Sequence, residues 1–367
     1  MNQPLYKNHD APPRMPDEAH RGLWFERFFA AYDPDTWNIS KPGRQGDPRL
    51  LWLQNLTAGP AGDPHALREA ADTRYSLARS LGGDARCYST EGPFATGLGL
   101  PHPMENGFSW HPTLGVPYLT GAALKGLLRA WLQVWEPLAD TVLDDWFGTT
   151  EAAGRFICFD ALPLKPVRLT ADVMTPHMGK WYAEGATPSN DPAVVPADWH
   201  DPIPVHFLAV KQAQFLVALA PRRAADTELV GKLFEHLTKA LAFMGAGGKT
   251  AAGYGRLGPD ETSLERLAED NQRRHEHQLQ QRARAQMDPF ELELQDLIKG
   301  KDSPAAALVE ALKQGRWQGA QARRAANMAR QLMKDTKNWR PESTRKKDRK
   351  NSERALWLIE TFFKDQP

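Results

Sequence analysis

The stretch GAGGKTAAGYGR at residues 245–256 excludes two common nucleotide-binding folds. It contains the Gly-Lys-Thr that ends a P-loop, but the first glycine of that motif would fall at residue 243, which is Phe243. Residues 253–258 have the letters of a dinucleotide fingerprint, yet no strand pattern precedes them and Pro259 follows. Both motifs follow a strand, whereas the pattern before this stretch predicts a helix. A nucleotide fold is therefore not expected.

The residue types of this glycine loop suit contact with phosphate. Closely spaced glycines let a ligand approach the backbone N–H groups. Lysine adds a point charge, arginine a planar fork and tyrosine a stacking face. The alternative interpretation is a helix C-cap followed by a tight turn, and the residues alone leave both open. The phosphate-binding candidates are Gly245, Gly247, Gly248, Lys249, Thr250, Gly253, Tyr254 and Arg256.

Working outward from the loop, the patterns predict an α+β core. Strands are predicted at 84–90, 156–163 and 253–257, a strand pair (VHFLAV and QFLVALA) at 205–219, and helices at 121–138 and 227–243. The order βαββαβ is the ferredoxin-like arrangement. Two helices on one face would leave the other sheet face free, as in RNA-recognition-motif folds. We therefore predict a ferredoxin-like (RRM-like) core at 84–260, with a long irregular insertion at about 164–204.

The flanking regions have different compositions. Residues 1–83 predict an N-terminal extension: a polar, poorly ordered start at 1–22, a helix at 23–36, a loop at 37–62 and a helix from Asp63 to Gly82. Residues 261–367 are rich in Gln, Arg and Ala and predict a helical appendage. The run RKKDRK at 345–350 is expected to be a solvated loop, with RNA contact as the alternative.

Composition limits the function classes further. The 367 residues carry a net charge of +1, with +5 in residues 261–367 and −4 in residues 1–260, so any nucleic-acid surface on the main body must be local. Cys87 and Cys158 are the only cysteines, and no zinc spacing, disulfide framework or cofactor motif is found. No signal peptide and no apolar run of about 18 residues is present. A cytoplasmic protein without membrane contact is expected.

Two segments together resemble a known family. TGLGLPHPMENGFSWHPTLGVPYLTGAALKGLLRAW (96–131) is similar to the signature of the RAMP superfamily of CRISPR proteins, in which a Gly/Pro segment leads into a G-S-S-x-K-G-x-x-R helix start. Ala122 and Ala123 replace the usual Ser-Ser. The loop at 245–256 resembles the C-terminal glycine-rich loop of that superfamily. FDALP (159–163), DVMTPH (172–177) and PADWHDPIPVHFLAV (196–210) resemble one branch, the sixth subunit of the type III-B Cmr effector complex.

This resemblance covers roughly residues 84–258 and implies a RAMP core that binds CRISPR guide RNA near its 3′ end. It also implies contact with the guide–target RNA duplex and with other Cmr subunits, and a non-catalytic role. The 164–204 insertion would correspond to the thumb that RAMP subunits press between bases. Lys125 and Arg129, one and two turns into the 121–138 helix, share a face and suit phosphate. A solvated basic face is the alternative.

The insertion holds further RNA-binding candidates. His177 lies near its start, and Trp181 and Tyr182 offer stacking faces, as does Trp199. The alternative is that these aromatic side chains form a small core or contact a neighbouring subunit.

Catalysis is the first competing interpretation, and an assembly protein with incidental RNA contact is the second. A metal-dependent RNA endonuclease needs an acid cluster, for which Asp160 and Asp172 are the candidates. Asp160 suits a turn cap better. His102 and His111, with Glu105, are expected to order a loop rather than to bind a metal. We therefore predict no catalytic residue, metal or cofactor.

Overall fold

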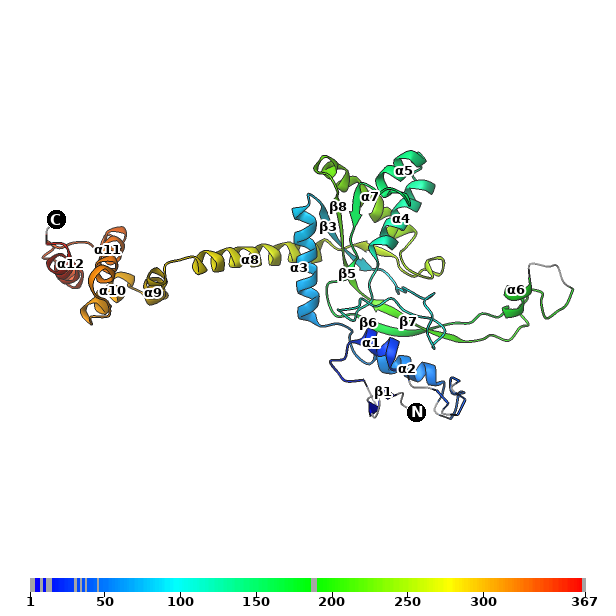
Figure 1. The fold of residues 1–367 in the computed structure, drawn as a ribbon. Coiled ribbons are helices and arrows are strands. Elements are labelled where there is room, and N and C mark those ends of the chain that lie inside the picture. Colours follow the sequence, from blue (N-terminus) through cyan, green and yellow to red (C-terminus); the bar gives the residue numbers. More distant parts are fainter. Residues whose placement is uncertain are drawn as a thin grey trace. The chain divides into compact units, whose positions relative to one another are not determined.

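The computed structural model describes residues 4–6, 9–10, 15–29, 32–33, 35–36, 38–44, 46–185 and 190–364. Contacts divide the chain into two compact units, Met1–Asn271 and Gln272–Pro367, which are described separately (Figure 1). The expected mixture of helices and sheet is confirmed. The first unit contains the helices α1 (Arg21–Arg27), α2 (Pro48–Thr57), α3 (Pro64–Ser80), α4 (Gly121–Val134), α5 (Asp140–Phe147), α6 (Gly179–Glu184) and α7 (Thr227–Phe243).

The main sheet of this unit is antiparallel and has the order β4-β8-β3-β9, with β5 also paired to β8. Along the chain the order is β3, α4, β4, β8, α7 and β9. Its strands are β3 (Asp84–Thr90), β4 (Phe156–Cys158), β5 (Leu162–Pro163), β8 (Gln214–Pro221) and β9 (Leu257–Pro259).

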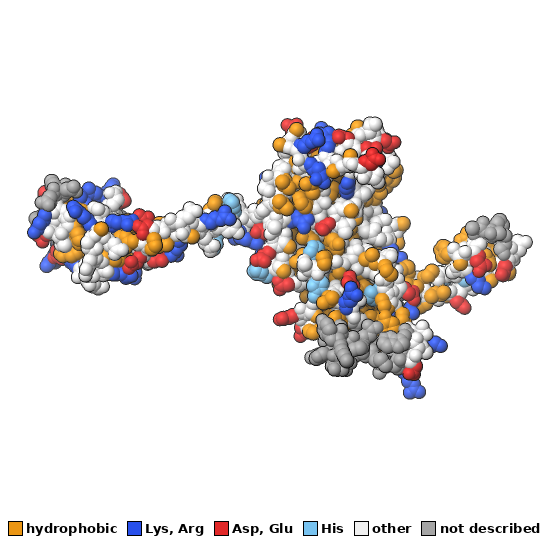
Figure 2. All heavy atoms as spheres, in the orientation of Figure 1, with side chains coloured by type: hydrophobic (Ala, Val, Ile, Leu, Met, Phe, Trp, Pro, Cys, Tyr) orange, Lys and Arg blue, Asp and Glu red, His pale blue; other side chains and the backbone are white. Residues whose placement is uncertain are grey.

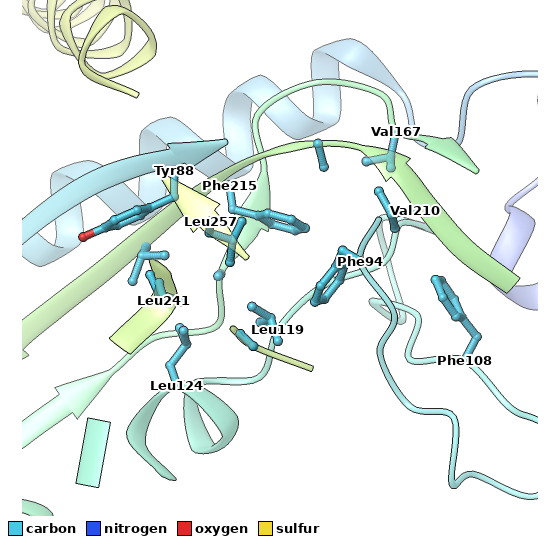
Figure 3. Close-up of a cluster of buried hydrophobic side chains, with 14 of the residues drawn as sticks. Tyr88, Phe94, Phe108, Leu119, Leu124, Val167, Val210, Phe215, Leu241 and Leu257 are labelled. Atoms are coloured by element: carbon cyan, nitrogen blue, oxygen red, sulfur yellow. The ribbon is translucent and has the colours of Figure 1, made fainter. Parts of the chain in front are cut away.

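Helices α4 and α7 pack against each other and against one face of this sheet. Their apolar faces meet side chains that alternate along the strands, as the period of two requires. Figure 3 shows Tyr88 of β3 and Phe215 of β8 together with Leu124 of α4 and Leu241 of α7. This core also extends to the aromatic side chains of the N-terminal helices.

The opposite sheet face is covered, so the expectation of a free face is wrong. Helix α3 packs on β3, β5 and β8, and the first turns of α8 (Glu261–Ala285) add Leu267. Ala85 and Cys87 of β3 lie under these helices. The expectation failed because the covering helices lie before and after the βαββαβ segment. An RRM-like sheet surface is therefore not available to RNA.

A two-stranded hairpin replaces much of the irregular segment expected at 164–204. Strand β6 (Arg168–Met174) pairs antiparallel with β7 (Val205–Gln212), and α6 lies between them in the chain (Figure 1). The irregular prediction was wrong for 168–174, whose partner strand begins thirty residues later. Residues 186–189 of the insertion lie outside the described residues.

The strands β7 and β8 are not paired with each other, although both fall within the predicted 205–219 segment. They follow one another across Ala213, so one extended run belongs first to the hairpin and then to the main sheet. Thr90 fixes this joint: its N–H donates to the Ala213 carbonyl (3.0 Å), and its hydroxyl oxygen accepts from the Ala213 N–H (3.0 Å).

The N-terminal extension differs from expectation in two places. The loop predicted at 37–62 contains α2, which Asp47 caps and Pro48 begins, and which buries Trp52 and Leu56. The helix predicted at 23–36 is shorter, since α1 spans Arg21–Arg27 and Tyr32 instead forms a bridge with Ile39. In the start expected to be poorly ordered, β1 (Pro4–Tyr6) pairs with β2 (His9–Asp10). Residues 1–3, 7–8, 11–14, 30–31, 34, 37 and 45 lie outside the described residues.

Other predicted elements need smaller corrections. The helix predicted at 121–138 ends at Val134. The strand predicted at 156–163 is divided into β4 and β5 around Asp160. The last strand begins at Leu257 instead of residue 253, because the preceding glycines adopt left-handed turn conformations. The strand at 84–90 and the helix at 227–243 are confirmed.

The second unit is helical and has its own apolar core. Phe290, Leu308, Trp317 and Leu358 are among its buried side chains. No helix among the described residues of either unit is long and apolar enough to cross a membrane. The helices after α8 are α9 (Pro289–Ile298), α10 (Pro304–Lys313), α11 (Gly319–Asp335) and α12 (Arg349–Phe362).

Candidate nucleic-acid interface

The start of α4 is capped by side chains of the protein itself. Thr120 accepts from the Ala123 N–H at 3.1 Å, and Asp160 accepts from the Gly121 N–H at 2.7 Å. Asp160 thus has the capping role expected for it. These carboxylate and hydroxyl groups satisfy two of the N–H groups that a phosphate would otherwise contact.

Lys125 and Arg129 differ in availability, although both lie on α4. Arg129 Nη2 donates to Asp144 Oδ1 at 2.7 Å, and its Nη1 lies 3.4 Å from the Leu143 carbonyl oxygen. This guanidinium therefore fastens α5 to α4. Lys125 has no ion-pair partner among the residues that the structure describes. Its positive charge lies close enough to the Cys158 thiol to influence the pKa of that thiol. Burial raises the pKa of that thiol to about 11, and the Lys125 charge partly opposes the rise.

The glycine loop is a closed turn that uses most of its own N–H groups. The N–H of Gly248 donates to the Ala95 carbonyl (2.7 Å), that of Ala246 to Gly255 (2.8 Å), and that of Gly255 to Pro93 (2.8 Å). The N–H groups of Gly245, Gly253 and Tyr254 also donate within the protein. The loop therefore does not present an open nest of amide N–H groups to a phosphate.

Backbone conformation and steric crowding explain why glycine occupies two positions of the loop. Gly247 has φ 88° and Gly255 has φ 74°, and this left-handed backbone conformation favours glycine over other residues. A Cβ atom at Gly247 would collide with the Ala95 carbonyl, and one at Gly255 with the Ala246 carbonyl. The glycines thus serve close packing of the loop on residues 93–95. Thr250 lies in a short 3-10 turn after Lys249, and the Arg256 carbonyl accepts from the Glu91 N–H at 2.9 Å.

The side chains of the loop meet the outer half of the β6–β7 hairpin, where its strands lead into the segment that contains α6. The Tyr254 hydroxyl donates to Asp172, which lies opposite Phe207 in the hairpin register. Lys249, held at φ 58°, places Nζ 5.2 Å from the centre of the Phe207 ring and 3.9 Å from Met174 Sδ. Two segments predicted separately, the glycine loop and the start of the insertion, therefore form one surface, called the loop–hairpin cluster below.

Electrostatics within this cluster follow from burial and from the Asp172 carboxylate. Burial first, and then the hydrogen bond and charge of Asp172, raise the pKa of Tyr254 to about 12. The neutral phenol is therefore strongly favoured. Lys249 has no ion-pair partner among the described residues, and its ammonium group lies against the Phe207 ring face and the Met174 thioether.

Comparison with known proteins identifies the segment that holds this cluster. The RAMP superfamily model matches residues 87–258. This segment belongs to the RAMP superfamily. The RAMP segment includes α4, the β6–β7 hairpin and the glycine loop, and it excludes most of the N-terminal extension and all of Gln272–Pro367.

Curated relatives match the RAMP segment but not the whole chain. A Pyrococcus furiosus protein named CRISPR system Cmr subunit Cmr6 is 44% identical over 149 residues, 39% of this chain and 42% of the relative. The Saccharolobus solfataricus Cmr6 is 24% identical over 153 residues, 41% of this chain and 48% of the relative. The chain thus spans less than half the length of these relatives.

Solved structures also match part of the chain. A chain in the cryo-EM structure of the Type III-B Cmr-beta bound to cognate target RNA is 19% identical, with a TM-score of 0.47, and the match covers 58% of this chain and 71% of that one. The crystal structure of Cmr6 from Pyrococcus furiosus is 27% identical, with a TM-score of 0.32, and the match covers 48% of this chain and 97% of that one.

The far end of the hairpin of the RAMP segment carries exposed aromatic side chains. Trp181 of α6 is 37% exposed, Tyr182 is 73% exposed, and Trp199, which follows in the chain, is 67% exposed. None of the α6 residues is buried. His177 is exposed as well. These side chains do not form the small core that was the alternative interpretation for them.

The histidines of the Gly/Pro segment order the backbone and do not form a site. His102 stacks on Phe25 with ring centres 4.0 Å apart, and its Nε2 lies 2.8 Å from the Phe25 carbonyl oxygen. Glu105 pairs with Arg49 of α2. His111 instead packs edge-on against Tyr118. Burial lowers the pKa of both histidines. Within the described ranges, no cluster of three or more His, Cys, Asp or Glu side chains suits a metal ion.

The sequence did not point to Phe207, Met174 or Ala95, although all three contact the glycine loop. Phe207 lies in the apolar run VHFLAV, where every residue looks like core. A signal existed for Met174: the alternation DVM at 172–174 places Asp172 and Met174 on the same strand face.

Proposed function

We propose that this chain is a non-catalytic, guide-RNA-binding subunit of a type III-B CRISPR effector complex. In this proposal it lies near the 3′ end of the guide and contacts the guide–target duplex and neighbouring Cmr subunits. The observation that carries the proposal is the loop–hairpin cluster. It joins Lys249 of the glycine loop to the outer half of the hairpin ladder, and the segment beyond that ladder carries three exposed aromatic rings.

The chemistry of this surface suits an RNA backbone and unpaired bases. Lys249 and Lys125 are cations without an acid partner among the described residues, and phosphate is a natural counter-charge. The exposed rings of Trp181, Tyr182 and Trp199 offer faces on which any base stacks. Neither contact reads sequence, as a protein that serves many different guides requires. The similarity to proteins named Cmr6 supports the same assignment.

Strand order supports the ferredoxin-like assignment of the core. The order β9-β3-β8-β4, with α4 and α7 on one face, follows the path that βαββαβ predicts. Because α3 and α8 cover the other face, RNA contact is assigned to the loop and the hairpin instead of the sheet.

Two acids considered for the endonuclease alternative have other partners in the structure. Asp160 accepts from the backbone at the start of α4, and Asp172 accepts from Tyr254. Asp172→Asn keeps an acceptor for the phenol and removes the carboxylate. We expect the assembled complex with this substitution to cut target RNA at the same positions as the wild type. Loss of any cut would favour the endonuclease alternative.

Guide retention tests the proposal directly. Lys125→Glu/Lys249→Glu reverses the two candidate cations, one in α4 and one in the loop–hairpin cluster, and Arg129 is left unchanged because it holds α5. The matched control is Lys165→Glu/Lys232→Glu, two exposed lysines of the same unit without an ion-pair partner in the described part of the chain. We expect the assembled complex with the first pair to lose guide RNA at lower salt than the control and the wild type.

The competing outcome is equally clear. If guide RNA co-purifies with the Lys125→Glu/Lys249→Glu complex at the wild-type level and with the wild-type salt sensitivity, these residues do not bind it. The chain would then be an assembly protein whose RNA contact is incidental.

A further inference from the structure

The C-terminal unit carries a charge opposite to that of the rest of the chain. Residues 272–367 contain 21 Lys and Arg and 13 Asp and Glu, a net charge of +8, whereas residues 1–271 contain 25 and 32, a net charge of −7. Figure 2 shows Lys and Arg side chains on the visible face of this unit, with acidic and hydrophobic side chains between them. The family match ends at residue 258, so this unit lies outside it.

The positive charge is concentrated at residues 334–354, which contain nine Lys and Arg and four Asp and Glu. Two of these acids are already paired, Asp348 with Arg340 at 3.1 Å and Glu353 with Arg349 at 2.9 Å. Six cations of this segment are exposed and have no ion-pair partner among the described residues. These are Lys334, Lys337, Arg345, Lys346, Lys347 and Lys350.

The fold brings the two ends of this segment together. Asn351 Nδ2 donates to Asn338 Oδ1 at 3.1 Å, and the Ser352 hydroxyl donates to the Pro341 carbonyl at 3.0 Å. Asn338 and Asn351, together with Arg354, line a small pocket of about 70 Å³. Lys337 and Lys350 directly precede the bonded asparagines, so cations from the end of α11 and the start of α12 lie at one site.

The surroundings of these cations favour a polyanion over a protein partner. Protein interfaces have apolar or aromatic anchors at their centre. Within residues 334–354 no large apolar side chain is exposed, and Leu356 of α12, just beyond them, is a single exposed leucine at 44%. The acids of α9 do not compensate the charge, because Glu291, Glu293 and Asp296 pair with other arginines.

We propose that Lys334, Lys337, Arg345, Lys346, Lys347, Lys350 and Arg354 form a second RNA-binding surface, which contacts the phosphate backbone of single-stranded RNA. The choice of RNA among nucleic acids rests on the proposed function, while the charge argument is independent of it. The surface provides only charged and amide donors, so it binds without sequence preference.

Binding of a fluorescein-labelled oligouridylate to the full chain, measured by anisotropy over a range of salt, tests this proposal. Lys346→Gln/Lys347→Gln/Lys350→Gln removes three exposed cations that have no ion-pair partner among the described residues, and of these Lys347 acts on Asp348 only through its charge. Lys299→Gln/Lys301→Gln/Lys364→Gln removes three exposed lysines of the same unit outside the surface. We expect the first variant to flatten the slope of log affinity against log salt by about 2, since each phosphate contact on a single strand contributes about 0.7. The second variant should keep the wild-type slope.

An equal loss of RNA affinity in both triple variants would mean that net charge alone matters. Unchanged RNA affinity in the first variant would mean that the surface does not bind RNA. Either result overturns the proposal. Loss of partner subunits with unchanged RNA binding would identify a protein-docking surface instead. The Lys125→Glu/Lys249→Glu variant separates the two proposals, because the C-terminal surface should keep its full salt-dependent contribution in that variant even if the proposed function fails.

Discussion

At the scale of single residues, side chains that looked alike in the sequence have different roles. Lys125 and Arg129 share a helix face, but the Arg129 guanidinium is held by Asp144 and by α5, while Lys125 has no such partner in the described structure. Asp172, the residue that a nuclease would need, accepts a hydrogen bond from Tyr254. These differences depend on partners distant in sequence, which no local pattern indicates.

The Tyr254–Asp172 bond predicts a change of stability at high pH. The pKa of Tyr254 is raised to about 12, whereas tyrosine in the unfolded chain titrates near 10. The folded state holds this proton more tightly, so the stabilisation is complete below about pH 10 and is lost as the pH rises toward 12. We expect the melting temperature to fall less steeply over this range in Tyr254→Phe than in the wild type.

The control for this measurement is Tyr182→Phe, which removes the hydroxyl of an exposed ring on the same hairpin. It should melt with the wild-type pH dependence. Parallel profiles for Tyr254→Phe and the wild type would contradict the raised pKa.

At the scale of elements, predictions from local signals succeeded and those that depend on distant partners failed. The α3 helix begins after Asp63, which caps it, and ends before Gly82 with its positive φ, as its sequence signals predicted. The α2 helix was missed because Gly and Pro surround its ten residues on both sides. The β6 strand was missed because its partner β7 follows only after the whole α6 excursion.

The candidate site was predictable in part for the same reason. The glycine loop, Lys125 and the aromatic residues of α6 could be selected by residue type. Their arrangement in space could not be predicted, because residues 93–95, which are distant in sequence from both segments, hold the glycine loop next to the hairpin. Phe94 pairs with Val210, and Ala95 pairs with Gly248.

The cover that α8 provides to the sheet predicts a clear difference between two leucines of that helix. Leu267 is buried with α3 and the sheet, whereas Leu279 is half exposed. We expect Leu267→Ala to lower the free energy of unfolding by about 2 kcal/mol or more, since burial of a leucine and the resulting cavity both contribute. Leu279→Ala should change it by less than about 0.5 kcal/mol. Denaturant titration measures both, and equal effects would mean that α8 does not cover the sheet.

At the scale of the whole molecule, each unit has its own apolar core, which predicts independent unfolding. Leu308 is fully buried within Gln272–Pro367. Leu308→Ala should lower the unfolding transition of that unit by several degrees, because a buried leucine replaced by alanine costs about 2–5 kcal/mol. The transition of Met1–Asn271 should keep its temperature in the same calorimetric scan. A joint shift of both transitions would show that the units unfold as one.

The single extended run from β7 into β8 has a mechanical consequence. A force applied to β7 reaches the middle of the main sheet along covalent backbone, because only Ala213 separates β7 from β8. The Thr90 contacts at Ala213 act as a fulcrum between the two sheets. Displacement of β7 is therefore opposed by β8, in which the residues from Phe215 to Pro221 are buried.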